Sequence, residues 1–208
     1  FSRWGDGEFN CMNAINNNNG KRKNTDQHEY FKDLGIELIE VLKQYDPNPN
    51  YIHALQNLAR NMHPELVSKF YAPYIYENIQ DADVLHKASI AGHFMQFMDA
   101  LKERDCMLVG PNRMIKLMKY FDFDFVIIPD FNCWKANKKI EEEIRKELKP
   151  NSVVLYSASM MSNVLIDRLW KDYNDTITQI DTGSVFEPYV GNVNRKYHQK
   201  IIESIRQK

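Results

Sequence analysis

The sequence lacks the features that define several large protein classes. Its 208 residues include only three cysteines, Cys11, Cys106 and Cys133, which lie far apart. An odd number of widely spaced cysteines fits neither a disulfide framework nor a zinc site, so we expect buried, reduced thiols in a cytoplasmic protein. No apolar run approaches the roughly 18 residues of a membrane-spanning helix. We therefore expect no membrane span.

A dominant charge is also missing. The 27 Lys and Arg residues face 28 Asp and Glu residues, which gives a formal net charge of -1. This balance excludes a strongly basic, nonspecific nucleic-acid binder. The patterns GxGxxG, GxxxxGK[ST] and GxSxG are absent as well. Their absence removes the usual dinucleotide-binding, P-loop and α/β-hydrolase interpretations.

What is present indicates a globular protein. Hydrophobic residues make up 43% of the chain, and a chain of this length can bury roughly 70% of its unfolded surface without a metal or disulfide. We expect one domain over residues 1–208, with two small lobes as the alternative. Because the chain begins at Phe1 without an initiator methionine, we expect residues upstream of Phe1 to be missing.

The C-terminal half alternates between short apolar runs and amphipathic stretches. This alternation predicts an α/β fold, with a Rossmann-like, mostly parallel sheet that carries helices on both faces. The N-terminal half is more helical. The predicted strands are 51–55, 105–110, 123–129, 152–156 and 176–180, and the predicted helices are 7–15, 27–44, 64–79, 91–102, 112–120, 135–148, 160–173 and 195–207.

Ligands of such sheets bind beyond the carboxyl ends of the strands. After the third predicted strand of the C-terminal half come Ser157 and Ser159. Hydroxyl side chains there suit a phosphate or nucleoside at a helix N-terminus, although a simple helix cap is equally compatible. The first and second strands of that half lead into residues 110–113 and 130–134.

The stretch after the last predicted strand, residues 181–191, also carries polar groups. Asp181 stands at the strand end, where it can accept a proton or hold a sugar hydroxyl. Gly183 and Ser184 offer a tight turn with free backbone amides. Glu187 is a second candidate base. An ordinary loop with a capping aspartate is the alternative interpretation.

Residues 3–8, Arg-Trp-Gly-Asp-Gly-Glu, are the most informative stretch. Asp6 and Glu8 stand two residues apart, so in an extended or turning backbone they point the same way and suit Mg²⁺ or Mn²⁺. Arg3 can fork onto a phosphate, and Gly5 and Gly7 let a ligand approach the backbone. The structural alternative is that Asp6 caps the following helix and Glu8 lies in its first turn.

Residues 3–8 resemble the R-[FYW]-G-D-G-E signature of the GT-D glycosyltransferases, a family first catalogued as a domain of unknown function. Weaker similarities extend the match over nearly the whole chain, at residues 108–111, 127–134, 153–165 and 180–184. The chain departs from the family pattern at Thr182, where the family has isoleucine, and at Ala158-Ser159, where it has Gly-Pro.

The resemblance implies a metal-dependent glycosyltransferase that transfers a sugar from a nucleotide sugar, typically UDP-glucose. Asp6 and Glu8 would hold Mn²⁺ or Mg²⁺, and Asp181 or, second, Glu187 would deprotonate the acceptor hydroxyl. Arg3, together with Lys87 or Arg113, would stabilise the leaving charge. The residues expected to contact the donor are Arg3, Gly5, Gly7, Gly110, Ser157, Ser159, Gly183 and Ser184.

The sequence does not identify the acceptor. A glycan or glycoprotein is the family's default. The Asn- and Lys-rich composition leaves a phage enzyme that glucosylates a hydroxymethylated DNA base as an alternative, with residues 21–23, 135–139 and 195–196 as basic candidates. A third interpretation is a noncatalytic nucleotide-binding module, in which Asp6 and Glu8 serve only the helix.

Overall fold

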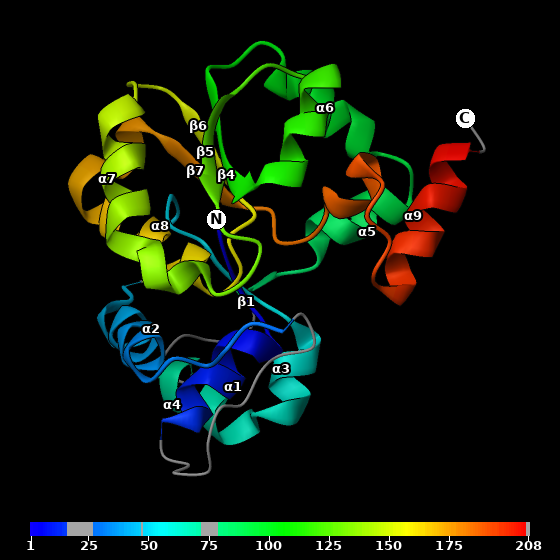
Figure 1. Ribbon diagram of the computed structural model, residues 1–208. Coiled ribbons are helices and arrows are strands. Elements are labelled where there is room, and N and C mark those ends of the chain that lie inside the picture. Colours follow the sequence, from blue (N-terminus) through cyan, green and yellow to red (C-terminus); the bar gives the residue numbers. More distant parts are fainter. Residues whose placement is uncertain (16–26, 47, 72–78, 207–208) are drawn as a thin grey trace.

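The computed structural model describes residues 1–15, 27–46, 48–71 and 79–206 (Figure 1). Its C-terminal half contains a four-stranded parallel sheet in the order β5-β4-β6-β7. A three-stranded parallel sheet, β1-β2-β3, belongs to the N-terminal half. The strands are β1 (Ser2–Trp4), β2 (His53–Leu55), β3 (Gln80–Asp81), β4 (Cys106–Pro111), β5 (Asp124–Ile128), β6 (Val153–Tyr156) and β7 (Thr178–Asp181).

The two sheets meet where the start of the chain lies beside β7. The amino group of Phe1 donates to the carbonyl of Gln179 at 2.7 Å, and the amide of Asp181 donates to the carbonyl of Phe1 at 2.9 Å. One residue that bonds to two alternate residues of its neighbour is the pattern of a parallel pair. The strands therefore follow one another in the order β5-β4-β6-β7-β1-β2-β3, which confirms the expected α/β fold with a parallel sheet.

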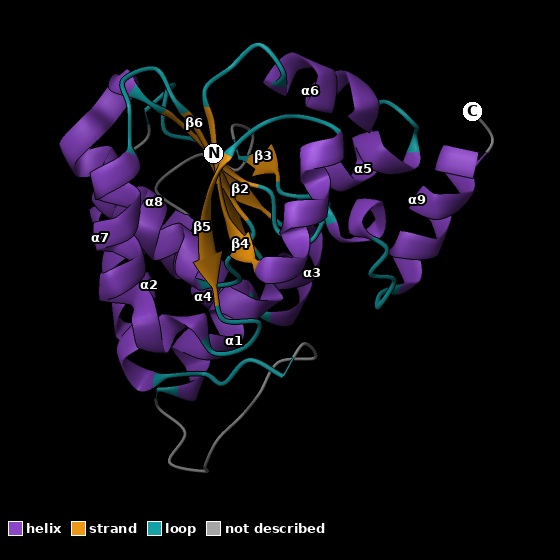
Figure 2. Cartoon of the chain, turned by 45° about the horizontal axis from the view of Figure 1, so that its top comes forward, coloured by secondary structure: helices purple, strands orange, loops and turns teal. Residues whose placement is uncertain are grey.

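Helices cover both faces of the sheet (Figure 2). On one side lie α2 (Lys32–Gln44), α7 (Asn137–Glu147) and α8 (Met161–Tyr173), and on the other lie α6 (Phe94–Leu101), the 3₁₀ helix η2 (Asn112–Lys119) and α9 (Lys196–Arg206). Side chains alternate along each strand. Met107 and Val109 of β4 therefore pack into the first core, whereas Leu108 between them packs into the second.

The remaining helices lie mostly around the N-terminal half. They are α1 (Asp6–Ala14), α3 (Asn57–Met62), α4 (Pro64–Tyr71) and α5 (Val84–Ile90). The described residues also contain the short 3₁₀ turns η3 (Cys133–Ala136), η4 (Asn174–Thr176) and η5 (Glu187–Val190). Among the described residues, no helix is both long and apolar enough to cross a membrane. All three cysteines are buried, as the sequence predicted.

Several predicted boundaries were wrong. The helix predicted over 112–120 is a 3₁₀ helix over Asn112–Lys119, in which the buried Met114 and Leu117, three residues apart, lie on one side. The helix predicted from residue 27 begins at Lys32, and the one predicted from residue 91 begins at Phe94. Residues 72–78 of the helix predicted over 64–79, and the basic residues 21–23, lie outside the described residues.

A buried histidine of β2 gives a stability prediction. His53 is 2% exposed and stacks on Tyr45 with 3.7 Å between the ring centroids. Burial holds the pKa of His53 well below its usual value. As the pH falls, His53 therefore becomes protonated in the unfolded chain but stays neutral in the folded chain. The free energy of unfolding should therefore fall by about 1.4 kcal/mol between pH 7.5 and pH 5.5 from this residue alone.

Urea unfolding of the wild type and of His53→Gln at both pH values measures this contribution. The variant should lose that part of the pH dependence, whereas His93→Gln, at an exposed position, should keep it. Equal pH dependence in the wild type and in His53→Gln would contradict the assignment.

Candidate active site at the carboxyl edge of the sheet

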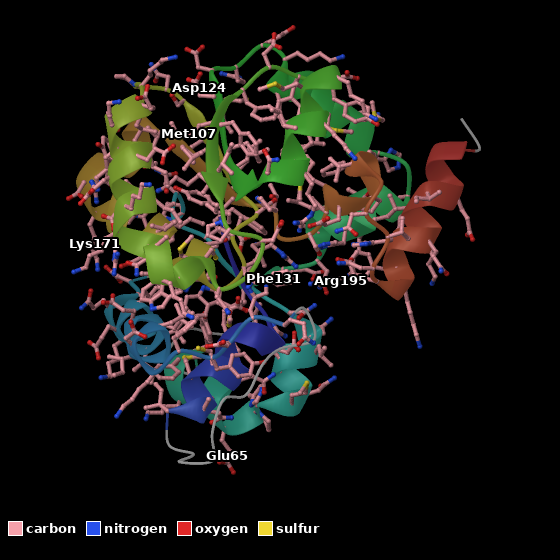
Figure 3. The ribbon with its side chains drawn as sticks, viewed as in Figure 1. Glu65, Met107, Asp124, Phe131, Lys171 and Arg195 are labelled. Carbon is pink, nitrogen blue, oxygen red and sulfur yellow. The ribbon has the colours of Figure 1, made fainter. Side chains whose placement is uncertain are left out.

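A pocket of about 180 Å³ lies beyond the carboxyl ends of β1 and β7. In Figure 3, Phe131 and Arg195 lie along the seam between the N-terminal helices and the C-terminal half, on the side of the molecule facing the reader. The pocket wall combines residues of α1 with the turn after β7 and with single residues from loops. Its lining residues are Arg3, Gly5, Asp6, Gly7, Glu8, His28, Gln56, Ser159, Met160, Asp181, Gly183, Ser184, Glu187 and Arg195.

The acidic pair of the motif lies in the first turn of α1. Gly5 is the N-cap, and the amide of Gly5 donates to Oε2 of Glu8 at 2.8 Å, which is half of a capping box. Gly5 thus occupies the N-cap position, and the side chain that caps the helix is that of Glu8. The structural alternative had instead named Asp6 as the cap. Both carboxylates nevertheless line the pocket. Burial raises the pKa of Glu8 to about 7, and the negative charge of Asp181 adds to the increase.

Arg3 is fixed on the pocket wall by contacts with the turn after β3. Its Nε donates to the carbonyl of Ala82 at 2.6 Å, and its Nη2 lies 3.4 Å from Oδ1 of Asp83. The guanidinium also lies against Gly183, whose φ is +53°. A Cβ atom at position 183 would stand 1.8 Å from Nη1 of Arg3. Only glycine permits both the backbone conformation and this close approach.

Asp181 is a buried carboxylate at the end of β7. It is 4% exposed, and its Oδ1 accepts a hydrogen bond from the amide of Gly183 at 2.9 Å. Burial raises the pKa of Asp181, and the charge of Arg3 partly offsets the increase. Nearby, the hydroxyl of Ser184 hydrogen bonds to the hydroxyl of Tyr197 on α9. The turn after β7 therefore presents a carboxylate, a glycine and a hydroxyl to the pocket.

Glu187 also lines the pocket, but Arg113 holds its carboxylate. Nε of Arg113 donates to Oε2 of Glu187 at 3.0 Å, and Nη2 donates to Oε1. Asn192 donates to the same group. A carboxylate with both oxygens engaged is a weaker candidate for general base than one with an open side. The two carboxylates therefore differ in their partners: Glu187 is held by the guanidinium of Arg113, whereas Asp181 accepts from the backbone amide of Gly183.

Two predicted donor contacts lie outside the pocket wall. Gly110 at the end of β4 faces the side chain of Met114 and Cβ of Ser157. Ser157 hydrogen bonds to the hydroxyl of Thr182 at 3.0 Å. Both residues therefore support the strand ends beneath the pocket, and the structure does not bring them to its surface.

Four lining residues were not among the predicted site residues. Arg195 was considered only as part of a basic face, and Met160 follows Ser159 at the start of the α8 segment. His28 and Gln56 come from loops that no sequence pattern singles out. Gln56 directly follows β2, so the carboxyl-edge rule would have found it had the pairing of β2 with β1 been known.

The residues present suit a cation shared with a ligand. Within the described ranges, no group of three or more His, Cys, Asp or Glu side chains is placed to hold a metal ion by itself. Mg²⁺ usually binds through one or two carboxylates and completes its shell with water and substrate phosphates. The extended backbone expected to align Asp6 and Glu8 was wrong, because both lie in α1, where residues two apart do not share a face. Both carboxylates line the pocket all the same, so they fit a cation that is shared with a phosphate ligand.

The fold and the pocket define an α/β protein with a polar pocket at the carboxyl edge of a parallel sheet. Over 92% of its length, the chain is similar to two solved structures of domain of unknown function 1792. One, described as showing that this highly conserved domain has a distinct glycosyltransferase fold, matches with a TM-score of 0.64 and 17% identity. The other, a selenomethionine-substituted form, matches with a TM-score of 0.62 and 18% identity.

The chain covers 76% of each of these structures. The likeness establishes that this chain has a glycosyltransferase fold. No family model matches the sequence, and no curated protein matches it either.

Proposed function

We propose that the protein is a metal-dependent glycosyltransferase that transfers a sugar, with glucose from UDP-glucose as the first candidate, to an acceptor hydroxyl. The observation that carries the proposal is the convergence of Arg3, Asp6, Glu8 and Asp181 on one pocket in a glycosyltransferase fold. Carboxylates, a cation and a strand-edge pocket are what the binding of a nucleotide diphosphate through a divalent ion requires.

The charges of the pocket support the proposed metal dependence. A diphosphate placed in it would meet the carboxylates of Asp6, Glu8, Asp181 and Glu187. Bound Mn²⁺ or Mg²⁺ supplies neutralisation of the leaving diphosphate. Asp6 and Glu8 would hold the ion. Arg3, fixed through Ala82, would donate to a phosphate oxygen and stabilise the charge that develops there.

The proposed transfer step needs no reactant besides the donor and the acceptor, and a residue of the pocket takes the released proton. The acceptor oxygen forms a bond to the anomeric carbon of the sugar, and the bond from that carbon to the diphosphate oxygen breaks. The nucleoside diphosphate leaves with the electron pair of the broken bond. The acceptor proton passes to the carboxylate of Asp181, which lines the pocket and whose Oδ1 accepts a hydrogen bond from the amide of Gly183.

A thermal-shift panel of UDP, GDP, CMP and dTDP, each with and without Mn²⁺, tests the proposal. One diphosphate should stabilise the protein only when Mn²⁺ is present, by about 2.7 kcal/mol at 100 times its dissociation constant. Mn²⁺ alone is the control, and EDTA should reverse the effect. The absence of any nucleotide-dependent shift would contradict the proposed function and leave Glu8 as a helix cap.

A further inference from the structure

A second cavity, of about 260 Å³, adjoins the proposed donor pocket. The two cavities share Arg3, Gln56 and Arg195 in their walls. They are also linked by the hydrogen bond between Ser184, which lines the donor pocket, and Tyr197, which lines the second cavity. The other lining residues of the second cavity are Asp83, His86, Lys87 and Ile90.

The two cavities have opposite charge. Four carboxylates and two arginines line the donor pocket, whereas Arg3, Lys87 and Arg195 line the second cavity with Asp83 as its single carboxylate. Asp83 already accepts from Nε2 of Gln56 at 3.2 Å and lies 3.4 Å from Arg3. The second cavity is therefore suited to an anionic group without the help of a metal ion.

His86 provides an independent indication of a ligand. It is 7% exposed, and burial with the nearby charge of Arg3 lowers the pKa of His86 to about 2, so the ring is neutral. Nη2 of Arg3 lies 3.5 Å from Nδ1 of His86. Arginine can only donate, so Nδ1 accepts and Nε2 carries the proton. Among the described residues, no hydrogen-bond acceptor meets Nε2. A buried donor left without an acceptor is costly, and His86 is one of the residues that line the second cavity.

We propose that the second cavity binds the acceptor, and that this acceptor is a sugar-like molecule carrying a phosphate or carboxylate. The assignment rests on the proposed function, which places the donor in the neighbouring pocket. Arg3 stands in the shared wall and faces both ligands. The cavity also contains Ile90 and the ring of Tyr197, against which the apolar face of a sugar can pack.

Calorimetric titration without metal, at low ionic strength, tests the assignment with four probes: glucose 6-phosphate, glucuronate, glucose and inorganic phosphate. One or both anionic sugars should bind the wild type more tightly than glucose and inorganic phosphate do, and whichever binds identifies the anionic group. Lys87→Glu should weaken that binding at least tenfold, because it reverses a charge on the cavity wall.

Lys102→Glu is the matched control. Both lysines are exposed and each is paired with an aspartate, Lys87 with Asp81 and Lys102 with Asp99, but Lys102 does not line the cavity. Lys102→Glu should therefore leave the affinity for the anionic sugars unchanged. The structure does not bring Lys87 to the wall of the donor pocket, where the sequence analysis had expected it to stabilise the leaving charge. The Mn²⁺-dependent affinity for UDP should therefore stay within twofold of the wild type in both variants.

The two proposals fail in different ways. If UDP binds with Mn²⁺ but the anionic sugars bind no better than glucose or inorganic phosphate, or bind Lys87→Glu equally well, the acceptor assignment is overturned and the proposed function stands. A tenfold loss of UDP affinity in Lys87→Glu would assign the second cavity to the donor, and this result would also overturn the acceptor assignment. If no nucleotide binds the wild type, the proposed function fails, and with it the acceptor role.

Discussion

Gly183→Ala should lower the rate of sugar transfer by about 100-fold or more, which corresponds to about 2.7 kcal/mol of transition-state stabilisation. The new Cβ would stand 1.8 Å from Nη1 and 3.0 Å from Cζ of Arg3. Arg3 cannot simply swing aside, because its Nε is held by the carbonyl of Ala82 at 2.6 Å. The guanidinium would have to leave the position from which we propose that it stabilises the leaving phosphate.

Gly191→Ala is the matched control for this prediction. Gly191 also has a positive φ, +86°, but nothing lies within 4 Å of the position that its Cβ would occupy. Both substitutions cost about 1–2 kcal/mol of backbone strain, and only Gly183→Ala also displaces Arg3. The free energy of unfolding and the rate of donor-dependent UDP release should be measured for both variants and the wild type.

The comparison separates two causes of lost activity. Full activity in Gly183→Ala would show that Arg3 does not act in the pocket. An equal loss in both variants would assign the effect to backbone strain near the turn. Loss in Gly183→Ala alone, with similar stability in the two variants, is the expected result.

The C-terminal half of the fold could be predicted because its strands are buried on both faces. Apolar runs such as 105–110 and 152–156 can be recognised as buried strands from their local composition alone, without knowledge of the strands that pair with them. The three residues of β1 and the two of β3 are too short to show any periodicity. Their pairing depends on contacts such as that of Phe1 with Gln179, which no local pattern encodes.

The pocket could be predicted in part for a related reason. The carboxyl ends of parallel strands meet at one edge, so the stretch at Asp181 and the motif at Asp6 and Glu8 were expected near a common ligand. Gly110 and Ser157 satisfy the same rule, yet Gly110 packs against Met114, Ser157 is hydrogen bonded to Thr182, and neither lines the pocket. Which strand ends stay open depends on how the following loops pack, and the sequence alone does not reveal that packing.

Asp6→Asn should weaken the Mn²⁺-dependent binding of UDP by at least 100-fold and leave the fold intact. In the proposed site, an amide oxygen would replace one of the two carboxylates that would hold the cation, so the site would lose a charged ligand. Loss of a negative charge in the first turn of α1 costs only about 0.3–1 kcal/mol of stability. Asp33→Asn, in the first turn of α2 and outside the pocket, is the control for that electrostatic effect.

Glu8 needs two substitutions, because its carboxylate also caps α1. Glutamine at position 8 can still accept the amide of Gly5, so Glu8→Gln should keep the helix and lose the metal-dependent affinity for UDP. Glu8→Ala should lose both, with about 1 kcal/mol of stability removed with the cap. Thermal unfolding with UDP, with and without Mn²⁺, reports both quantities in one experiment.

These variants decide what the acidic motif does. If Asp6→Asn and Glu8→Gln both bind UDP with Mn²⁺ as the wild type does, the metal site is elsewhere and the motif serves the helix alone. If only Glu8→Gln retains full affinity, Asp6 is the sole ligand from the motif and Glu8 acts through the capping contact with Gly5. Loss of affinity in both, with Asp33→Asn unchanged, is what two carboxylates on one cation require.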